Sequence, residues 1–467
     1  MATRCSLRYF VLSFVASLCV TPHCHSENPI IQTNFTADPA PLVYKGTVYL
    51  YTSHDEDDAT EFKMVNWKLY TSTDMVNWID RGTVASLATF PWAVQTNNAW
   101  APQAIERNGK FYLYVPISVP AKPDRVIAVA VADSPLGPFE DALGHPLIDK
   151  APGNIDPTVF IDDDGQAYLY WGNPDLWYVK LNKDMISYSG DIVKVDSKPQ
   201  NYQEGPWFYK RNDKYYMAYA SHCCPEGIGY AMSNSPTGPW EYKGMIMEPD
   251  GRSSGNHPGI IDYKGSSYVF GFNYRLNFSL TNVHRERRSV CAAKFRYNSD
   301  GTIPTIPWWN NEGVAQLGSL DPYARVKAAA MSWTSGSKTG AWTYGVRTAQ
   351  EKKVGVYVTH ILNGSYIKVR GVDFGDHQVS SFTANVASGS DGGVIELHLD
   401  SIDGPVIGSL PVSDTGGWYK WRSQTTTVSG AAGVHDLYFV FKGEVTGQLF
   451  NFDYWKFNKK GAKRAKS

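Results

Sequence analysis

A repeated pattern of apolar and polar positions runs through the first two thirds of the chain. Each copy begins at a proline, continues as a short apolar strand, turns at polar or glycine residues and returns as a strand rich in Tyr and Phe. The copies begin at Pro39, Pro102, Pro157, Pro206 and Pro258. Their spacing of about 50 to 60 residues suits a unit of four short strands, which predicts β-propeller blades rather than solenoid rungs. We therefore expect five blades; the alternative is a β-sandwich whose hairpins resemble one another.

The last third of the chain has a different pattern. From about residue 320 onward the proline-led repeat stops, and short alternating strands rich in Thr, Ser, Val and Tyr follow one another. This pattern predicts a β-sandwich of ordinary domain size. Because no long amphipathic helical period is present, the expected fold class is all-β. The expected domains are a five-bladed β-propeller at residues 27–310 and a β-sandwich at residues 320–460.

The N-terminal 26 residues have the pattern of a secretory signal peptide. Arg4 and Arg8 precede an apolar run from Tyr9 to Val20, and this run is too short to span a membrane. We expect cleavage near Ser26 and a secreted, extracellular protein.

Three cysteines would remain after this cleavage, namely Cys223, Cys224 and Cys291. In an oxidising compartment, three cysteines predict one disulfide and one thiol left over. We expect Cys291 to pair with one of the two neighbouring cysteines.

The charge balance argues against two classes of partner. Lys and Arg together number 44, and Asp and Glu together number 45, so neither nucleic acid nor a membrane surface is an expected partner. The aromatic content is high instead, with 15 Trp, 29 Tyr and 20 Phe. Strands of this composition, separated by Gly and Pro, support the all-β expectation.

Three carboxylates occupy equivalent places in the repeats. Asp38 and Asp156 directly precede their repeat prolines, Glu204 precedes the Gly-Pro of the fourth repeat, and His257 precedes the fifth proline. The innermost strands of all blades run beside the propeller axis, so these positions should converge on one pocket. The alternative for each acid alone is a turn residue that caps a backbone N–H.

Two carboxyl groups on opposite sides of a pocket suit the hydrolysis of a glycosidic bond. One carboxylic acid protonates the leaving oxygen, and the other, ionised, activates water or attacks. A third acid nearby raises the pKa of the proton donor by like-charge repulsion. Trp100 and Trp171 are the expected aromatic floor for a sugar. The competing hypothesis is a non-catalytic sugar-binding propeller whose acids only hydrogen-bond hydroxyl groups.

Four segments resemble glycoside hydrolase family 43, a family of five-bladed propeller enzymes that cleave arabinose- and xylose-containing polysaccharides with inversion. They are "ADPAPLVYKGTVYLY", "NIDPTVFIDDDGQAYLYWG", "YQEGPWFYKRNDKYYMAYAS" and "NHPGIIDYKGSSYVF". The resemblance implies that Asp38 is the general base, Glu204 the general acid and Asp156 the residue that tunes the pKa of the acid and positions it. The implied activity is release of α-L-arabinofuranosyl groups from arabinoxylan, with β-xylosidase or mixed activity as the alternative.

The same resemblance implies further roles near the axis. His257 resembles the axial histidine of the family, which lies near a calcium ion; because calcium prefers oxygen ligands, His257 would contribute only indirectly or through water. The alternative is a histidine hydrogen-bonded within the channel. Arg275, in "FNYRLN", is the candidate for the arginine beside the acid, and no organic cofactor is implied. The acidic segment "SHDEDDATEF" from Ser53 is expected to be a solvated loop at the rim, with a second metal site as the alternative.

Two C-terminal segments resemble carbohydrate-binding module family 6, a jelly-roll sandwich that holds xylan-like chains. They are "IELHLDSIDGPVIGSLPVSDTGGWYKW" and the ending "FNFDYWKF". Trp418 and Asn451 lie in the ligand motifs of that family. His360 stands in place of a tyrosine of the family, and "RVKAAAM" lacks the glutamates that hold its structural calcium. Sugar binding by this domain and a purely structural role therefore both remain open.

Overall fold

The structure is a computed structural model that describes residues 25–120, 124–251, 253–335, 347–352, 354–376 and 379–460. The predicted signal peptide lies outside these residues except for its last two positions. The regular secondary structure of the described residues is almost entirely β-strand, with the 3₁₀ turn η1 (Leu87–Thr89) and the short helix α1 (Arg275–Leu280). None of their helices has the length and apolar character needed to cross a membrane. The all-β prediction is confirmed.

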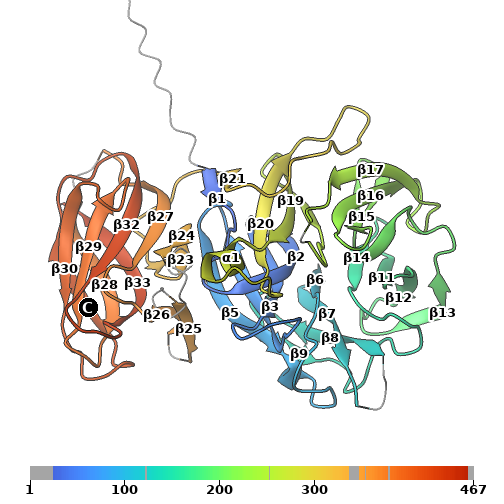
Figure 1. Cartoon of the computed structure of the whole chain (residues 1–467), viewed down its shortest axis with the longest axis horizontal. Coiled ribbons are helices and arrows are strands. Elements are labelled where there is room, and N and C mark those ends of the chain that lie inside the picture. The colour runs from blue at the N-terminus through green and yellow to red at the C-terminus, as the bar shows by residue number, and fades with distance from the viewer. Residues whose placement is uncertain are drawn as a thin grey trace, which may run out of the picture.

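Five antiparallel sheets follow one another along the larger part of the described chain (Figure 1). The first sheet contains β2 (Phe35–Tyr44), β3 (Thr47–Asp55), β4 (Asn66–Ser72), β5 (Trp78–Ser86) and β23 (Ala330–Met331). The second contains β6 (Gln103–Arg107), β7 (Lys110–Ser118), β8 (Arg125–Ala132) and β9 (Glu140–Asp141). The third contains β10 (Thr158–Ile161), β11 (Ala167–Trp171), β12 (Trp177–Leu181) and β13 (Tyr188–Lys194). The fourth contains β14 (Tyr202–Arg211), β15 (Lys214–Ser221), β16 (Gly227–Ser233) and β17 (Glu241–Met247). The fifth contains β18 (Gly259–Tyr263), β19 (Ser266–Asn273) and β20 (Ser289–Phe295).

The first strand of each sheet contains its repeat proline or directly follows it. These first strands contact one another in sequence, since β2 contacts β6 and β18 while β10 contacts β6 and β14. Trp207 of β14 donates its indole N–H to the carbonyl of Ile260 in β18, at 2.9 Å. The five repeat prolines also surround one small hollow of about 20 Å³. The proline-led segments therefore converge on a common centre.

The turn predicted inside each repeat is present. In three of the five first hairpins, a two-residue loop ends in a glycine with a positive φ, as at Gly46, Gly109 and Gly265. The residue before each glycine also has a positive φ, which matches the twist of the flanking strands. The fourth hairpin uses Asn212 and Asp213 in the same way. The repeated turn chemistry thus fixes the register of the strand pairs.

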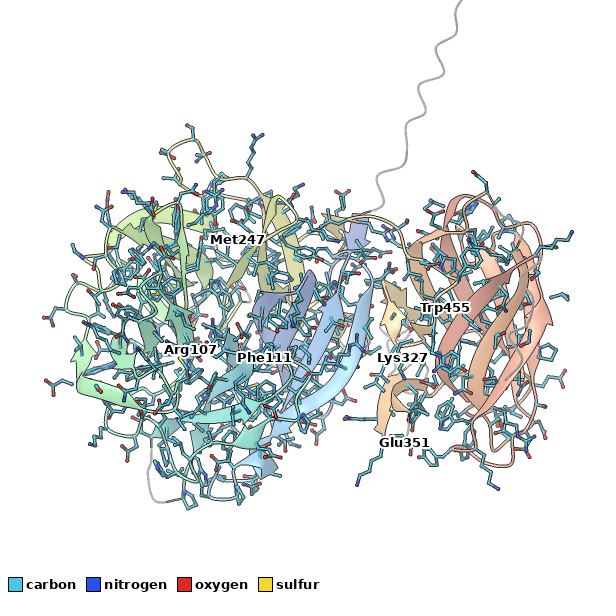
Figure 2. All side chains as sticks on the ribbon, turned by 180° about the vertical axis from the view of Figure 1, so that it is seen from behind. Arg107, Phe111, Met247, Lys327, Glu351 and Trp455 are labelled. Carbon is cyan, nitrogen blue, oxygen red and sulfur yellow. A yellow bond between two sulfur atoms is a disulfide. The ribbon has the colours of Figure 1, made fainter. Side chains whose placement is uncertain are left out.

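The C-terminal strands form two further sheets that share one apolar core. One contains β25 (Arg347–Glu351), β26 (Gly355–Thr359), β33 (Asn451–Lys459), β28 (Val379–Ala387) and β31 (Arg422–Thr427), with β22 (Val326–Lys327) paired to β33. The other contains β24 (Trp333–Thr334), β27 (Tyr366–Asp373), β32 (Val434–Lys442), β29 (Gly393–Leu399) and β30 (Val406–Val412). Phe439 of one sheet packs against Phe382 and Trp455 of the other. Figure 2 shows Trp455 among these sheets, well apart from Phe111 of the larger part.

The two parts are joined by backbone as well as side chains. β23 pairs with β5, so a segment that lies in the chain between β22 and β24 of the C-terminal sheets extends the first sheet of the larger part (Figure 1). The amide of Asn77 donates to the carbonyl of Arg370 and accepts from its N–H, both at 2.9 Å, as a neighbouring strand would. Near the N-terminus, β1 (His25–Glu27) pairs with β21 (Glu312–Ala315).

Candidate active site

A pocket of about 540 Å³ opens where the first strands of the five sheets meet, and its lining includes all three predicted acids. Asp38 comes from β2, Asp156 stands two residues before β10, and Glu204 belongs to β14. Asp38 and Asp156 are buried, and the Glu204 side chain is 15% exposed. The structure thus brings together residues that are more than 160 positions apart in the sequence.

A shared backbone bend places the acids. Asp38 and Asp156, each just before a repeat proline, have φ values of 50° and 56°, and Gly205 in the fourth sheet has 58°. Few residues other than glycine adopt this left-handed conformation, and it is found often at functional sites. A Cβ at Gly205 would lie 2.5 Å from the His257 ring, so no side chain fits there. The fourth acid position therefore moves to Glu204, whose longer side chain enters the pocket.

His257 stands among the three acids. Its Nδ1 lies 3.4 Å from an oxygen of Asp38, and its Nε2 lies 3.5 Å from one oxygen each of Asp156 and Glu204. Burial disfavours the charged ring, but the carboxylates of Asp156, Asp38 and Glu204 outweigh it and raise the pKa of His257 to about 10. At neutral pH the imidazole is a buried cation that offsets the negative charge of the acids.

Arg288 is a second buried cation, and it holds Asp38. Its guanidinium donates to Asp38 at 3.0 Å and to both oxygens of Asp55, at 3.0 and 2.9 Å. Ser53 donates its hydroxyl to the other oxygen of Asp38 at 2.5 Å. Both oxygens of Asp38 therefore accept hydrogen bonds, and the planar fork of Arg288 fixes the orientation of the carboxylate.

Asp156 and Glu204 have different partners. Asp156 accepts the backbone N–H of Gly205 at 3.1 Å, and Glu204 accepts the side-chain amide of Asn173. Burial is the largest influence on Asp156, and together with the charges of Glu204 and Asp38 it raises the pKa of Asp156 to about 7, against the opposing effect of His257. Asp156 can therefore exchange a proton near neutral pH.

Three expectations about the pocket require correction. Trp171 is fully buried, donates its N–H to Asn154 and packs in the core beside β10 and β11, so it does not line the pocket. Arg275 donates to the carbonyl of Asn28, and its guanidinium lies over the ring of Trp333, so these contacts include none of the three acids. The arginine beside Asp38 is Arg288. The acidic segment after Ser53 is not wholly a solvated loop.

Asp55, within that acidic segment, ends β3 with no exposed surface and is paired with Arg288. It is therefore part of the support of the site. The sequence could not identify Asp55 as a supporting residue, because it stands among four other acids of the same segment and nothing in the sequence distinguishes it from them.

The pocket wall was predicted in part. Trp100 lines the pocket, as expected, and the guanidinium of Arg125 lies 3.9 Å from the centre of its ring. Phe62 stands nearby, 6.5 Å from Trp100 between ring centres. The guanidinium covers one face of the Trp100 ring and can donate hydrogen bonds to sugar hydroxyl groups, while the remaining surface of Trp100 and Phe62 in the lining offers apolar contact.

The cysteine prediction was wrong in its pairing. Cys223 and Cys224 are bonded to each other and line the pocket mouth. Cys291 lies in β20 as a buried free thiol that contacts the carbonyl of Ser289. Its strand runs through the core, where neither of the two exposed cysteines can reach it. Glu226, just after the disulfide, also lines the pocket and was not anticipated.

The group of side chains at the centre that could hold a metal ion supplies only part of a calcium coordination shell. Asp156, Glu204 and His257 are close enough together to hold a metal ion in principle. Calcium takes 6–8 oxygen ligands, however, and this group offers two carboxylates and one ring nitrogen. Water would have to supply the remaining ligands of a calcium ion bound to this group.

The two predicted sugar-binding residues of the C-terminal sheets lie together. The amide of Asn451 donates to the carbonyl of Trp418 at 2.7 Å and accepts from Gln448 at 2.6 Å. Asn451 is buried, whereas Trp418 is partly exposed. Trp418 therefore offers the accessible surface, and Asn451 holds the loop that carries it.

Comparison with known proteins relates both parts to carbohydrate-active families. The family model "Glycosyl hydrolases family 43" matches residues 26–303, and "Carbohydrate binding module (family 6)" matches residues 337–459. An arabinoxylan arabinofuranohydrolase of Bacillus subtilis (strain 168) is 35% identical, with 95% of this chain and 94% of the relative covered. One of Paenibacillus polymyxa is 34% identical, with 92% and 74% covered.

A solved structure gives the same relation in three dimensions. The crystal structure of a glycoside hydrolase family 43 arabinoxylan arabinofuranohydrolase from Bacillus subtilis in complex with cellotetraose superposes with a TM-score of 0.80 at 34% identity. The match covers 93% of this chain and 97% of that structure, so it includes both sets of sheets.

Replacing Arg288 with methionine tests the support of the acids. The variant leaves Asp55 buried without a counter-charge, so we expect the free energy of unfolding to fall by about 3–5 kcal/mol. Urea denaturation measures this loss. Arg287→Met removes a neighbouring cation that is less buried; its guanidinium donates to the carbonyl of Ala59 and lies over the ring of Phe35, and this variant should change stability far less. Adding Asp55→Asn to Arg288→Met should restore part of the loss; a single variant as stable as the native protein would contradict the assignment.

Proposed function

We propose that this chain, which belongs to glycosyl hydrolases family 43, is a secreted enzyme that releases α-L-arabinofuranosyl side groups from arabinoxylan-type plant polysaccharide. The observation that carries the proposal is the arrangement of Asp38, Asp156 and Glu204 around His257 in one open pocket. The naming of two extensive relatives as arabinoxylan arabinofuranohydrolases supports the substrate class.

The five sheets of the larger part are, in this proposal, the blades of a five-bladed β-propeller. The contacts between successive first strands and the ring of five prolines around one hollow support this arrangement. The C-terminal pair of sheets with its shared core supports a jelly-roll sandwich. In the proposed division the propeller occupies residues 27–310 and the sandwich residues 320–460.

The roles of the acids follow from their partners. Asp38 accepts hydrogen bonds from Arg288 and Ser53, which fix its orientation and suit a general base that takes a proton from water. Glu204 is the proton donor to the leaving oxygen, and the amide of Asn173 holds its side chain. Asp156, between Gly205 and His257, orients the acid and can hold a proton near neutral pH.

The position of His257 between Asp38 and Glu204 is compatible with inversion. His257 contacts Asp38 with one ring nitrogen and Glu204 with the other, at 3.4 and 3.5 Å. These two contacts, with the imidazole ring between them, permit a separation in the roughly 6.5–9.5 Å range of inverting glycosidases. A separation in that range would leave room for a water molecule between the base and the sugar.

The reaction products test this function directly. We expect incubation with arabinoxylan to release arabinose, and proton NMR in the first minutes to show the anomer of inverted configuration. Parallel incubations with arabinan and xylo-oligosaccharides separate the arabinofuranosidase from a β-xylosidase or mixed enzyme. A product of retained configuration would rule out the assigned roles, and no release from any of the three substrates would favour a sugar-binding propeller.

The variant Glu204→Gln tests the acid. Glutamine cannot donate the proton, so we expect turnover on arabinoxylan to fall about 10²- to 10⁴-fold while the protein stays folded. Nitrophenyl arabinofuranoside has a good leaving group that needs less protonation, and its hydrolysis should decline much less. Steady-state rates on both substrates and the circular dichroism spectrum provide the comparison, and equal losses on the two substrates would contradict the role.

The C-terminal sandwich is proposed to bind xylan-type chains through Trp418. The side chain is partly exposed, and Asn451 fixes the loop that presents it. Truncation is a poor test of this role because it would also remove β23, which pairs with β5, and Arg370, which bonds to Asn77. A point substitution separates binding from support.

Trp418→Ala should weaken binding to insoluble arabinoxylan and slow its hydrolysis, because the tethered pocket loses effective concentration near the polymer. Soluble arabinoxylo-oligosaccharides reach the pocket unaided, and their hydrolysis should hardly change. Pull-down with insoluble xylan, rates on both substrates and thermal melting measure the effect, with Tyr419→Ala, an exposed neighbour, as the matched control. Unchanged pull-down would show that the sandwich does not bind through this residue.

A further inference from the structure

Glu226 is a buried acid of the pocket that the roles above do not use. It stands between the bonded pair Cys223–Cys224 and β16, is 2% exposed and lines the same pocket as Glu204. We propose that Glu226 is a positioning residue for the reaction: its carboxylate fixes the segment 253–257 against Glu204, and its negative charge opposes ionisation of Glu204. The inference rests on the proposed function of that site.

Four hydrogen bonds join Glu226 to this segment. Its Oε2 accepts the backbone N–H of Gly255 and, at 3.1 Å, that of Asn256. Its own backbone N–H donates to the carbonyl of Ser253 at 3.2 Å, and the hydroxyl of Ser253 donates to the carbonyl of Glu226 at 2.5 Å. Side chain and backbone together therefore hold the segment in one place, as a strand partner would.

The segment that Glu226 holds lies against the reacting groups. A Cβ at Gly255 would be 3.6 Å from an oxygen of Glu204, 3.3 Å from Arg288 and 3.8 Å from Nε2 of His257. The N–H of His257 donates to the carbonyl of Gly255 at 2.9 Å. A displacement of this segment would thus move His257, the cation that the three acids share, and change the surroundings of Glu204.

Glu226 also interacts electrostatically with the acid. Burial, and next the charge of Glu204, raise the pKa of Glu226 to about 7, while His257 and the two N–H donors act in the opposite direction. Repulsion between two carboxylates is mutual, so a charged Glu226 disfavours a charged Glu204 by the same energy. Arg288 faces this region across Gly255, and the charged residues Asp38, Asp124, Arg125 and Asp156 line the same pocket. A proton donor gains from such a neighbour because it must reach the substrate protonated.

Two substitutions separate the positioning by hydrogen bonds from the effect of charge. Glu226→Gln keeps an oxygen that can accept both N–H groups but removes the charge. Its kcat should stay within a few-fold of the native value, and the alkaline limb of the pH profile of kcat/KM should move about one unit to lower pH. The direction follows because that limb reports loss of the proton from the acid, and removing a nearby negative charge makes the loss easier.

Glu226→Asp keeps the charge but shortens the reach to Gly255 and Asn256. We expect kcat to fall by up to about 10²-fold, since small misplacements of reacting groups are costly, while the alkaline limb stays near its native position. Glu248→Gln, at an exposed acid in the same part of the chain, is the control and should alter neither quantity. Thermal melting of each variant confirms that the fold is kept.

The outcome that overturns the inference is a folded Glu226→Gln with a native pH profile together with a folded Glu226→Asp with native kcat. A change in melting temperature alone, with both kinetic quantities unchanged, would likewise show that Glu226 is structural only. If the native protein releases no sugar from any substrate, the proposed function itself fails, which these variants do not decide. Activity in the native protein with no kinetic effect in the variants rejects only the role of Glu226.

Discussion

Compensation of buried charge is the constraint on which the rest of the site depends. Asp38, Asp156 and Glu204 surround His257, and Asp55 lies behind them, so several carboxylates share a region with little access to water. Unpaired buried charges cost several kcal/mol each. His257 and Arg288 supply the opposite charges. Removing either cation would leave acids that must take up protons or move apart, and the division into base and acid would then be lost.

The fold meets this constraint by repetition. The left-handed residue before a repeat proline turns Asp38 in the first sheet and Asp156 in the third toward the same centre. In the fourth sheet that residue is Gly205, because the ring of His257 occupies the space of a side chain there. Glu204 then reaches the pocket from one residue earlier. The shift of the fourth acid by one residue and the central position of His257 therefore depend on each other.

The sequence revealed what the repeat encodes and little of what lies outside it. The meeting of the three acids and His257 in one pocket was predictable because each stands one or two residues before a repeat proline. Arg288, Asp55 and Glu226 have no such marker: they lie before β20, at the end of β3 and before β16, and only the packing of separate sheets brings them together.

The predictions for Trp171 and for the disulfide were wrong for the same reason: they depend on how separate strands pack. Trp171 has the residue type of a sugar-binding floor, but its strand position turns it into the core. The bonding of Cys223 to Cys224 depends on which strands enclose Cys291, and neither composition nor spacing carries that information.

The junction of the two parts changes how a C-terminal sugar-binding module should be regarded. A module on a flexible linker would contribute only proximity to the polymer. Here β23 extends the first sheet of the larger part, and Asn77 bonds to the backbone of Arg370 much as a strand would. The first sheet also supplies Asp38 and Asp55 to the site. Support of the catalytic part and binding of polysaccharide are therefore compatible roles, because the β23–β5 pairing and the Asn77–Arg370 bonds involve neither Trp418 nor Asn451.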